Sequence, residues 1–179
     1  MNRIGTVYGQ GLYALAKEEG LEKTVLQQLQ TLDSAFAEEP AFIKLLASAN
    51  MPKQERTQIL DESFREKVHI YVLNFLKLLT EKGYIRHFFA CYQAYRQQYN
   101  ADNGILEVCA VAAISVTDDQ KASLTEKLAA ITGKQIDLVC KVDPAVLGGI
   151  RLSYDGKQVD GTLKGRLDAI GKTLASTVL

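Results

Sequence analysis

The sequence predicts an α+β protein of two domains: an N-terminal antiparallel six-helix bundle followed by a small α/β domain. Before Gly104, apolar residues recur at spacings of three and four, which is the period of amphipathic helices. After Gly104 the period is two, then 3.6, which predicts the order strand, helix, strand, strand, helix. Turn-forming residues 101–104 separate the two patterns, so we expect domains at 1–104 and 105–179.

Each of the six predicted helices carries one apolar face. Gly20 and Gly83 end the first and fifth helices, and Pro40 and Pro52 precede the third and fourth. Connections of only a few residues favour an antiparallel bundle. The apolar positions are, helix by helix, Tyr8, Leu12, Leu15 and Ala16; Val25, Leu29, Leu32 and Phe36; Phe42, Ile43, Leu45 and Leu46; Ile59, Leu60 and Phe64; Val68, Val72, Phe75, Leu76 and Leu79; and Ile85, Phe88, Tyr92, Tyr95 and Tyr99.

The second domain begins with alternating apolar residues. Thr117 and Gln120 form a capping-box pattern, which predicts a helix that ends at Gly133. The apolar positions are Leu106, Val108, Ala110, Ala112, Ile114 and Val116 for the first strand, Leu124, Leu128 and Ile131 for the helix, and Ile136, Leu138, Cys140 and Val142 for the second strand.

The chain after this second strand is rich in turn signals. Asp143-Pro144 stops the strand, since proline has no ladder donor. Gly148-Gly149 opens a third strand, and Asp155-Gly156 predicts a two-residue hairpin. After Gly161 a last helix is predicted by the stripe Leu163, Leu167, Ile170 and Leu174.

Composition excludes several classes of function. The chain has 179 residues, of which 47% are hydrophobic, and its 21 basic and 21 acidic residues give zero net charge. Nucleic-acid binding relies on clustered Lys and Arg, so we expect no nucleic-acid partner. No apolar run approaches the roughly 18 residues of a membrane span, and residues 1–4 begin no signal peptide, so we expect a soluble protein without membrane insertion. Cys91, Cys109 and Cys140 form no CxxC pair and are interpreted as free thiols in a reducing compartment.

Two glycine motifs resemble phosphate-binding loops but lack their context. Gly9, Gly11 and Ala14 spell GxGxxA, yet they lie inside the first helix rather than after a strand. We interpret them as small residues that let another helix approach closely. Gly156-Lys157 lacks the other residues of a P-loop, because Arg151 and Gln158 stand where that motif needs glycine and Ser or Thr.

No catalytic, cofactor or metal site is predicted. His69 and His87 are the two histidines, and neither has a second ligand three or four residues away. Tyr92, Tyr95 and Tyr99 have helical spacing without basic neighbours, which favours core and rim positions over base stacking.

A family resemblance rests on the C-terminal motifs. The run from Asp143-Pro144 to Gly148-Gly149, then Asp160-Gly161-Thr162-Leu163-Lys164-Gly165-Arg166-Leu167, resembles the signature of the delta subunit of bacterial F-type ATP synthase, called OSCP in mitochondria. The signature residues are Asp143, Pro144, Gly148, Gly149, Asp160, Gly161, Gly165 and Arg166. The chain departs from the family at Gly9 and Gly11, where alanine is usual, and at Tyr84, where arginine is common.

The resemblance implies a non-catalytic stator subunit of the peripheral stalk, present in one copy per complex at the cytoplasmic face of the membrane. Residues 1–104 would bind N-terminal segments of the alpha subunits on the catalytic head, and residues 105–179 the C-terminal region of the b subunit. This link would prevent the head from turning with the rotor during proton-driven ATP synthesis. The alternatives are a generic two-domain adaptor of another pathway and an enzyme with a cofactor cleft between the domains.

The resemblance also indicates where these partners would bind. The alpha-subunit segment would lie in a groove between the first and fifth helices. The candidate groove residues are Tyr8, Leu12, Leu15, Val72, Phe75, Leu76 and Leu79. Gly148-Gly149 would aim the hairpin that follows, and Lys164 and Arg166 would either meet a partner's acidic residue or face solvent.

Overall fold

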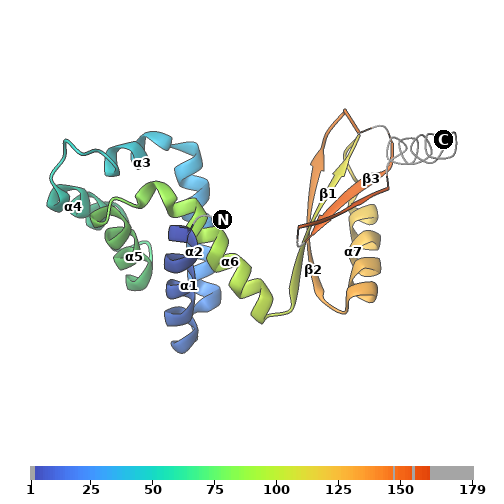
Figure 1. Ribbon diagram of the computed structural model, residues 1–179, viewed down its shortest axis with the longest axis horizontal. Helices are drawn as coiled ribbons and strands as arrows, with labels where there is room; N and C mark the ends of the chain where they lie inside the picture. The colour runs from blue at the N-terminus through green and yellow to red at the C-terminus, as the bar shows by residue number, and fades with distance from the viewer. Residues whose placement is uncertain (1–2, 147, 155, 162–179) are drawn as a thin grey trace, which may run out of the picture. The chain divides into compact units, whose positions relative to one another are not determined.

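The computed structural model describes residues 3–146, 148–154 and 156–161, coloured along the chain in Figure 1. The chain divides into two compact units, residues 1–99 and 100–179. Helices dominate the first unit, and a four-stranded sheet with one described helix makes up the second. The predicted α+β class is therefore confirmed.

Unit 1 contains the helical segments that the apolar periodicity predicts. They are α1 (Arg3–Glu18), α2 (Glu22–Glu38), α3 (Pro40–Leu46), α4 (Lys53–Phe64), α5 (Ile70–Glu81), the 3-10 turn η1 (Ile85–His87) and α6 (Phe88–Asp102). Gly20 and Gly83 have φ of +67° and +74°, values that glycine adopts without strain and that end the preceding helices. Pro40 opens α3, as predicted. The antiparallel bundle arrangement itself stays a prediction.

The core of unit 1 collects the apolar faces of these helices. Tyr92 and Tyr95 of α6 are buried, which confirms their interpretation as core residues. The Tyr95 hydroxyl donates a hydrogen bond of 2.9 Å to the carbonyl oxygen of Glu22, so a buried polar group has a partner. Tyr13 meets the Tyr95 ring edge-on at 5.3 Å, a favoured aromatic geometry.

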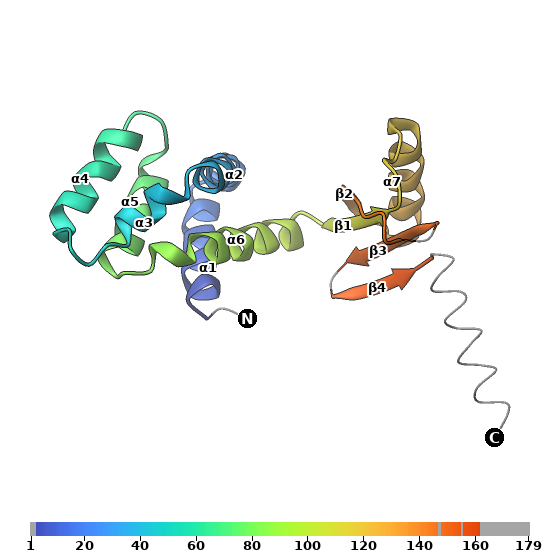
Figure 2. The same cartoon turned by 90° about the horizontal axis from the view of Figure 1, so that it is seen from above.

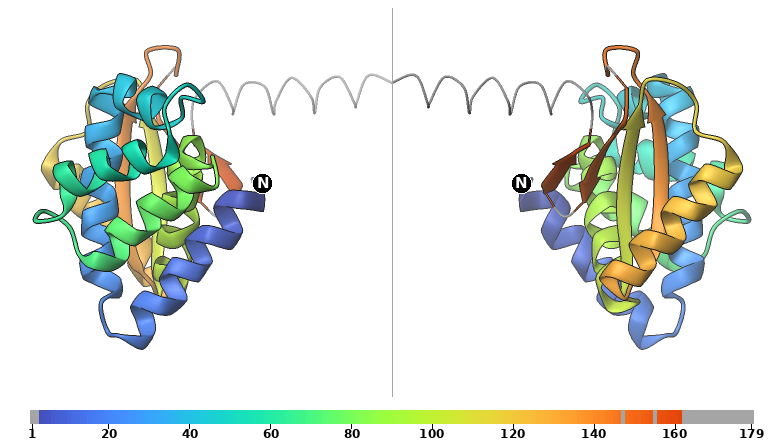
Figure 3. Two further views of the ribbon diagram at one scale, coloured as in Figure 1. Left: turned by 90° about the vertical axis from the view of Figure 1, so that its left-hand side faces the viewer. Right: turned by 90° about the vertical axis from the view of Figure 1, so that its right-hand side faces the viewer.

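Unit 2 contains β1 (Ile105–Ala112), α7 (Asp118–Thr132), β2 (Gln135–Val142), β3 (Ile150–Tyr154) and β4 (Lys157–Asp160). The sheet order is β2-β1-β3-β4; β1 and β2 are parallel, and the other two pairs are antiparallel. The parallel pair needs a crossover, which α7 provides. Figure 2 labels the four strands in this order, and Figure 3 shows α7 along one face of the sheet.

The first strand is shorter than predicted. β1 ends at Ala112, so Ile114 and Val116 lie beyond it, and Ile114 is exposed. Ala112 is paired with Val142, the last residue of β2, and the Asp143 amide then donates to the Ala112 carbonyl. Because Asp143-Pro144 ends the partner strand, β1 has nothing further to pair with.

The helix and turn signals of unit 2 are confirmed where the structure describes them. The Thr117 hydroxyl accepts from the Gln120 amide and the Gln120 side chain accepts from the Thr117 amide, which completes the capping box. Gly133, at φ +66°, caps the end of α7. Ile131, predicted on the apolar face of this helix, lies in its last turn and is exposed.

The hairpin and the last helix bring the described chain to its end. Tyr154 pairs with Lys157, so two residues connect β3 and β4, as predicted. Asp155 of that connection and the stripe predicted for the last helix (Leu163, Leu167, Ile170 and Leu174) lie outside the described residues. Within the described residues, no helix has the length and apolarity to cross a membrane.

Candidate functional site

An apolar groove of about 430 Å³ lies between α1 and α5 in unit 1. Figure 1 shows the two helices side by side. Eight of the nine lining residues are apolar or aromatic, and the ninth is Asn74. They are Val7, Tyr8, Gly11, Leu12 and Leu15 of α1, and Tyr71, Asn74, Phe75 and Leu78 of α5.

Helical periodicity explains how nine residues reach one groove. Val7, Gly11 and Leu15 are spaced by four along α1, so they form one ridge on its surface. Tyr71, Phe75 and Leu78 are spaced by four and three along α5 and form the facing ridge. Ridges of this kind are what a third helix packs against.

The groove has a buried floor and an exposed apolar rim. Leu12 and Phe75 form the floor, each 6% exposed. Val7, Leu15 and Leu78 form the rim and are 61%, 40% and 39% exposed. An apolar rim that stays in water is a surface on which a partner can bury further area.

The two glycines of the GxGxxA pattern have different roles. A Cβ placed on Gly9 would overlap with the carbonyl oxygen of Cys91 and lie 2.9 Å from the Ala94 Cβ, so α6 approaches α1 closely there. The close-approach interpretation is confirmed for Gly9. It is wrong for Gly11, where no described residue would lie within 4 Å of an added Cβ, and the glycine instead leaves room in the groove.

The structure places the predicted groove residues in two groups. Tyr8, Leu12, Leu15 and Phe75 line the groove, whereas Val72, Leu76 and Leu79 are fully buried in the core of unit 1. The latter three are therefore corrected from groove to core residues, because they lie on the face of α5 turned toward the other helices.

Sequence reasoning missed Val7, Gly11, Tyr71, Asn74 and Leu78. A signal for the α5 residues is present in the sequence IYVLNFLKLLTE, which has more apolar residues than one buried face can hold. A helix of this composition at the surface of a helical unit has a second apolar face to cover.

His69 fixes the start of α5 and with it one side of the groove. Its Nδ1 accepts a hydrogen bond of 3.3 Å from the Tyr71 amide, and its own amide donates to the Gln28 side chain at 2.8 Å. The His69 ring also meets the Tyr71 ring at 4.9 Å. The imidazole is thus a helix cap that positions a groove residue.

Within the described residues there is no group of His, Cys, Asp or Glu that could hold a metal ion. Cys91, Cys109 and Cys140 are free thiols. Burial raises the pKa of the Cys91 thiol to about 11, so at neutral pH it is protonated and unreactive.

The described signature residues of unit 2 shape the turn between β2 and β3. The Asp143 carboxylate accepts from the Ala145 amide at 2.9 Å, and the Asp143 carbonyl accepts from the Val146 amide at 3.0 Å. Pro144 is exposed within this turn. Gly148 and Gly149 follow at φ of +64° and +77°.

Asp160 and Gly161 tie the hairpin to its neighbouring strand. Asp160 pairs with Arg151 across β3 and β4, with 3.6 Å between Nε and Oδ2. The Gly161 amide donates to the Ile150 carbonyl at 3.1 Å. These contacts are structural, and the remaining signature residues, Gly165 and Arg166, lie outside the described residues.

Comparisons with known proteins agree over nearly the whole chain. The sequence profile of the family described as the ATP synthase delta (OSCP) subunit matches residues 4–174. The chain is 28% identical over 176 residues to ATP synthase subunit delta of Prochlorococcus marinus subsp. pastoris, covering 98% of each chain. It is 28% identical over 172 residues to the subunit of the same name from Alkaliphilus oremlandii, covering 96% of each.

A solved structure shares the fold. A chain of the mitochondrial ATP synthase hexamer of Toxoplasma gondii matches with a TM-score of 0.78 at 17% identity, covering 97% of this chain and 98% of that one. The profile match and the fold agree with the resemblance carried by the Asp143–Arg166 motifs. The chain therefore belongs to the ATP synthase delta (OSCP) subunit family.

Proposed function

We propose that this chain, a structural and non-catalytic subunit of the ATP synthase peripheral stalk, links the catalytic head to the b-subunit stalk. Unit 1, taken as a six-helix bundle, would bind N-terminal segments of the alpha subunits, and unit 2 would bind the C-terminal region of the b subunit. One copy per complex, at the cytoplasmic face of the membrane, would keep the head from turning with the rotor during proton-driven ATP synthesis. Membership of this family favours this function over that of a generic adaptor of another pathway.

The α1–α5 groove is the observation that supports the contact with the head. An amphipathic helix binds a groove through apolar residues at spacings of three and four, and it needs a floor, a rim and few charges. Leu12 and Phe75 supply the floor, and Val7, Leu15 and Leu78 supply the rim. None of the described residues that line the groove is charged.

Two separate compact units suit a mechanical link. If each unit binds a different part of the complex, release requires that both contacts open together, because the closed contact keeps the open one at high effective concentration. Each contact alone can then be of ordinary strength while the joint resists the load.

Leu15→Glu tests the groove. Leu15 is on the rim at 40% exposure, so its replacement removes apolar binding area and places a carboxylate against an apolar ligand. Burial of the remaining two-fifths of a leucine is worth about 0.6–1.2 kcal/mol from the usual 1.5–3 kcal/mol for a full side chain. A buried, unpaired polar group adds about 1–3 kcal/mol. We expect affinity for an alpha-subunit N-terminal peptide to fall roughly 15-fold or more, measured by calorimetric titration.

Leu45→Glu is the matched control. Leu45 is also 40% exposed, lies on α3 and does not line the groove. Its replacement should cost the same fold stability and leave peptide affinity unchanged. Leu12→Glu is unsuitable, because Leu12 is buried and a charge there would damage the core. Equal affinity of the Leu15→Glu and wild-type chains would remove this groove as the binding site.

A further inference from the structure

A second apolar hollow of about 600 Å³ lies in unit 1, between α2, α3 and the start of α6, and does not share residues with the α1–α5 groove. Its apolar lining includes Phe36, Ile43, Phe88 and Phe89. Phe89 is 59% exposed, although a phenylalanine of this size is normally kept from water. We call this hollow the α2–α3–α6 groove.

The floor of the α2–α3–α6 groove belongs to a cluster of packed aromatic rings. Phe36 meets the Phe88 ring edge-on at 5.0 Å, stacks with Phe42 at 5.8 Å and meets Phe64 at 6.2 Å. These rings come from four helices and hold one another in place. A floor fixed before binding loses little side-chain entropy when a ligand covers it.

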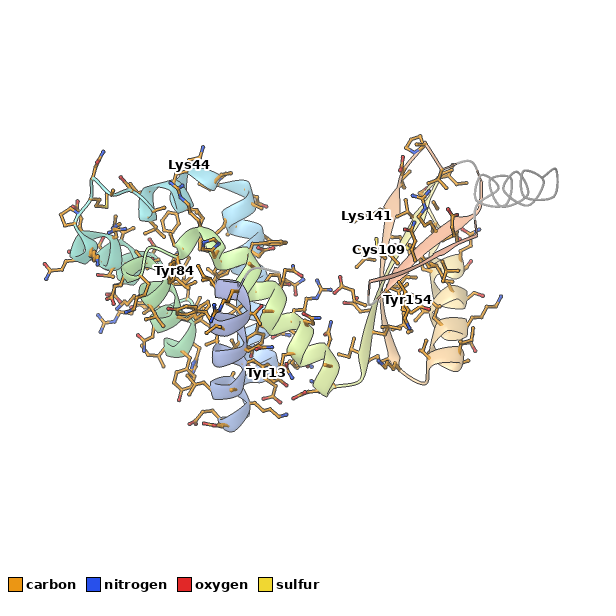
Figure 4. All side chains as sticks on the ribbon, in the orientation of Figure 1. Tyr13, Lys44, Tyr84, Cys109, Lys141 and Tyr154 are labelled. Atoms are coloured by element: carbon orange, nitrogen blue, oxygen red, sulfur yellow. The ribbon has the colours of Figure 1, made fainter. Side chains whose placement is uncertain are left out.

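The two cationic side chains that line the groove form no ion pair with a described residue. Lys44 of α3, labelled in Figure 4, and Arg86 of η1 both line the hollow and are exposed, and neither forms a hydrogen bond or ion pair within the described part of the chain. Two unpaired cations beside exposed apolar area complement a ligand that carries both carboxylates and an apolar stripe.

Asp33 supplies the opposite charge on the α2 wall. Burial raises the pKa of this carboxyl, which has no hydrogen-bond donor among the described residues. A carboxylate in this state gains from a donor that a ligand brings, such as a free amide of a helix N-terminus or a Lys side chain. The groove thus presents an acceptor in addition to its two cations.

We propose that the α2–α3–α6 groove binds an amphipathic helix of another ATP synthase subunit, whose apolar face covers Phe89 and whose carboxylates pair with Lys44 and Arg86. The inference rests on the proposed function only in taking the partner from the same complex. It gives unit 1 two separate protein-binding grooves, so that a partner at one leaves the other accessible.

Photo-cross-linking in the assembled complex tests this. Phe89→p-benzoylphenylalanine places a photoreactive ring on the groove, and Gln97→p-benzoylphenylalanine, at an exposed position of the same helix outside it, is the control. Irradiation of the purified complex should link position 89 to a segment of another subunit that carries carboxylates beside apolar residues spaced by three and four. Position 97 should not link to that segment.

Charge reversal supplies the second arm. The pair Lys44→Glu and Arg86→Glu should lower the cross-link yield from position 89 at least about tenfold, because like charges then face each other. The pair Lys53→Glu and Lys82→Glu makes the same change in net charge at exposed positions outside the groove and should leave the yield unchanged. If the reversed pair fails to assemble, Lys44→Gln with Arg86→Gln should still lower the yield several-fold.

The proposal is overturned if position 89 forms no protein cross-link, if the linked segment lacks carboxylates, or if both charge-reversed pairs give equal yields. These outcomes do not depend on the α1–α5 groove. Loss of peptide binding in Leu15→Glu with no cross-link from position 89 would uphold the proposed function and reject the second groove.

Discussion

The close approach of α1 and α6 yields a prediction with an internal control on the same helix. Gly9→Ala adds one methyl group where α6 leaves no room, and Gly11→Ala adds the same methyl group where nothing lies within 4 Å. Both positions are inside α1. The two variants therefore differ in packing and not in the chemistry of the substitution.

The magnitude follows from the contacts that the new methyl group would make. At Gly9 it would overlap with the carbonyl oxygen of Cys91 and approach the Ala94 Cβ to 2.9 Å, well inside the ordinary contact range of 3.4–4 Å. One of the two groups is backbone, so relief requires movement of a whole helix. Overpacking of this kind costs about 1–3 kcal/mol. Replacing a helical glycine by alanine gains roughly 1 kcal/mol at either position, so this gain cancels in the comparison.

We therefore expect Gly9→Ala to be less stable than Gly11→Ala by about 1–3 kcal/mol, and Gly11→Ala to be more stable than the wild type by about 1 kcal/mol. For a unit of this size, the first difference corresponds to roughly 5–20 °C in melting temperature. Tyrosine fluorescence is a suitable readout, because seven of the eight tyrosines precede residue 100 and the chain has no tryptophan. The signal thus reports mainly on unit 1.

The reasoning is refuted if Gly9→Ala melts at or above the temperature of Gly11→Ala. That result would mean that α1 and α6 can separate at no cost and that Gly9 is not a packing residue. A second readout comes from the groove: the methyl group of Gly11→Ala occupies part of the hollow, so peptide affinity should change in that variant even though the fold is stabilised.

Four further predictions concern unit 2 and the cysteine thiols. Thr117→Ala removes the hydroxyl of the capping box and should destabilise unit 2 by about 1 kcal/mol in urea titrations followed by circular dichroism. Gly149 has a φ of +77°, so Gly149→Val should lower the free energy of unfolding by about 1–2 kcal/mol or more and should reduce assembly into the complex. The pKa of the Cys91 thiol is 9.0 in the unfolded chain and about 11 in the folded one, because burial disfavours the thiolate. Between these pH values the unfolded chain binds fewer protons than the folded chain, so the free energy of unfolding falls as pH rises. Cys91→Ala should make the free energy of unfolding depend less steeply on pH in this range. At neutral pH, maleimide should label the half-buried Cys109 and Cys140 before the buried Cys91.

Local signals in the sequence predict the elements of this fold well. Gly20 and Gly133 adopt the positive φ that a glycine at a helix end favours, and Thr117 with Gln120 makes both hydrogen bonds of its capping box. These features depend on neighbours within a few residues, so the sequence contains the information needed to predict them.

Features that depend on distant partners are predicted less well. Alternation alone extends the first strand to Val116, but β1 ends at Ala112 because its partner β2 ends there. The two glycines in α1 read alike in the sequence, and only the position of α6 distinguishes Gly9, which is packed, from Gly11, which is open. Pairing and helix approach are set by the tertiary fold, which periodicity does not specify.

Tertiary contacts also decide which residues of α5 belong to the core and which line the groove. Leu76 and Leu79 are buried in the core of unit 1, while Leu78, on the rim of the groove, is 39% exposed. One face of α5 thus contributes to stability and another face lines the groove, because successive residues of a helix are rotated by about 100° and point in different directions. Substitutions on the buried face should lower both stability and peptide affinity, whereas substitutions at Leu78 should lower affinity alone. If unit 1 holds a partner under load, as proposed, this arrangement is favourable, because the groove is formed by a helix that the core already fixes in place.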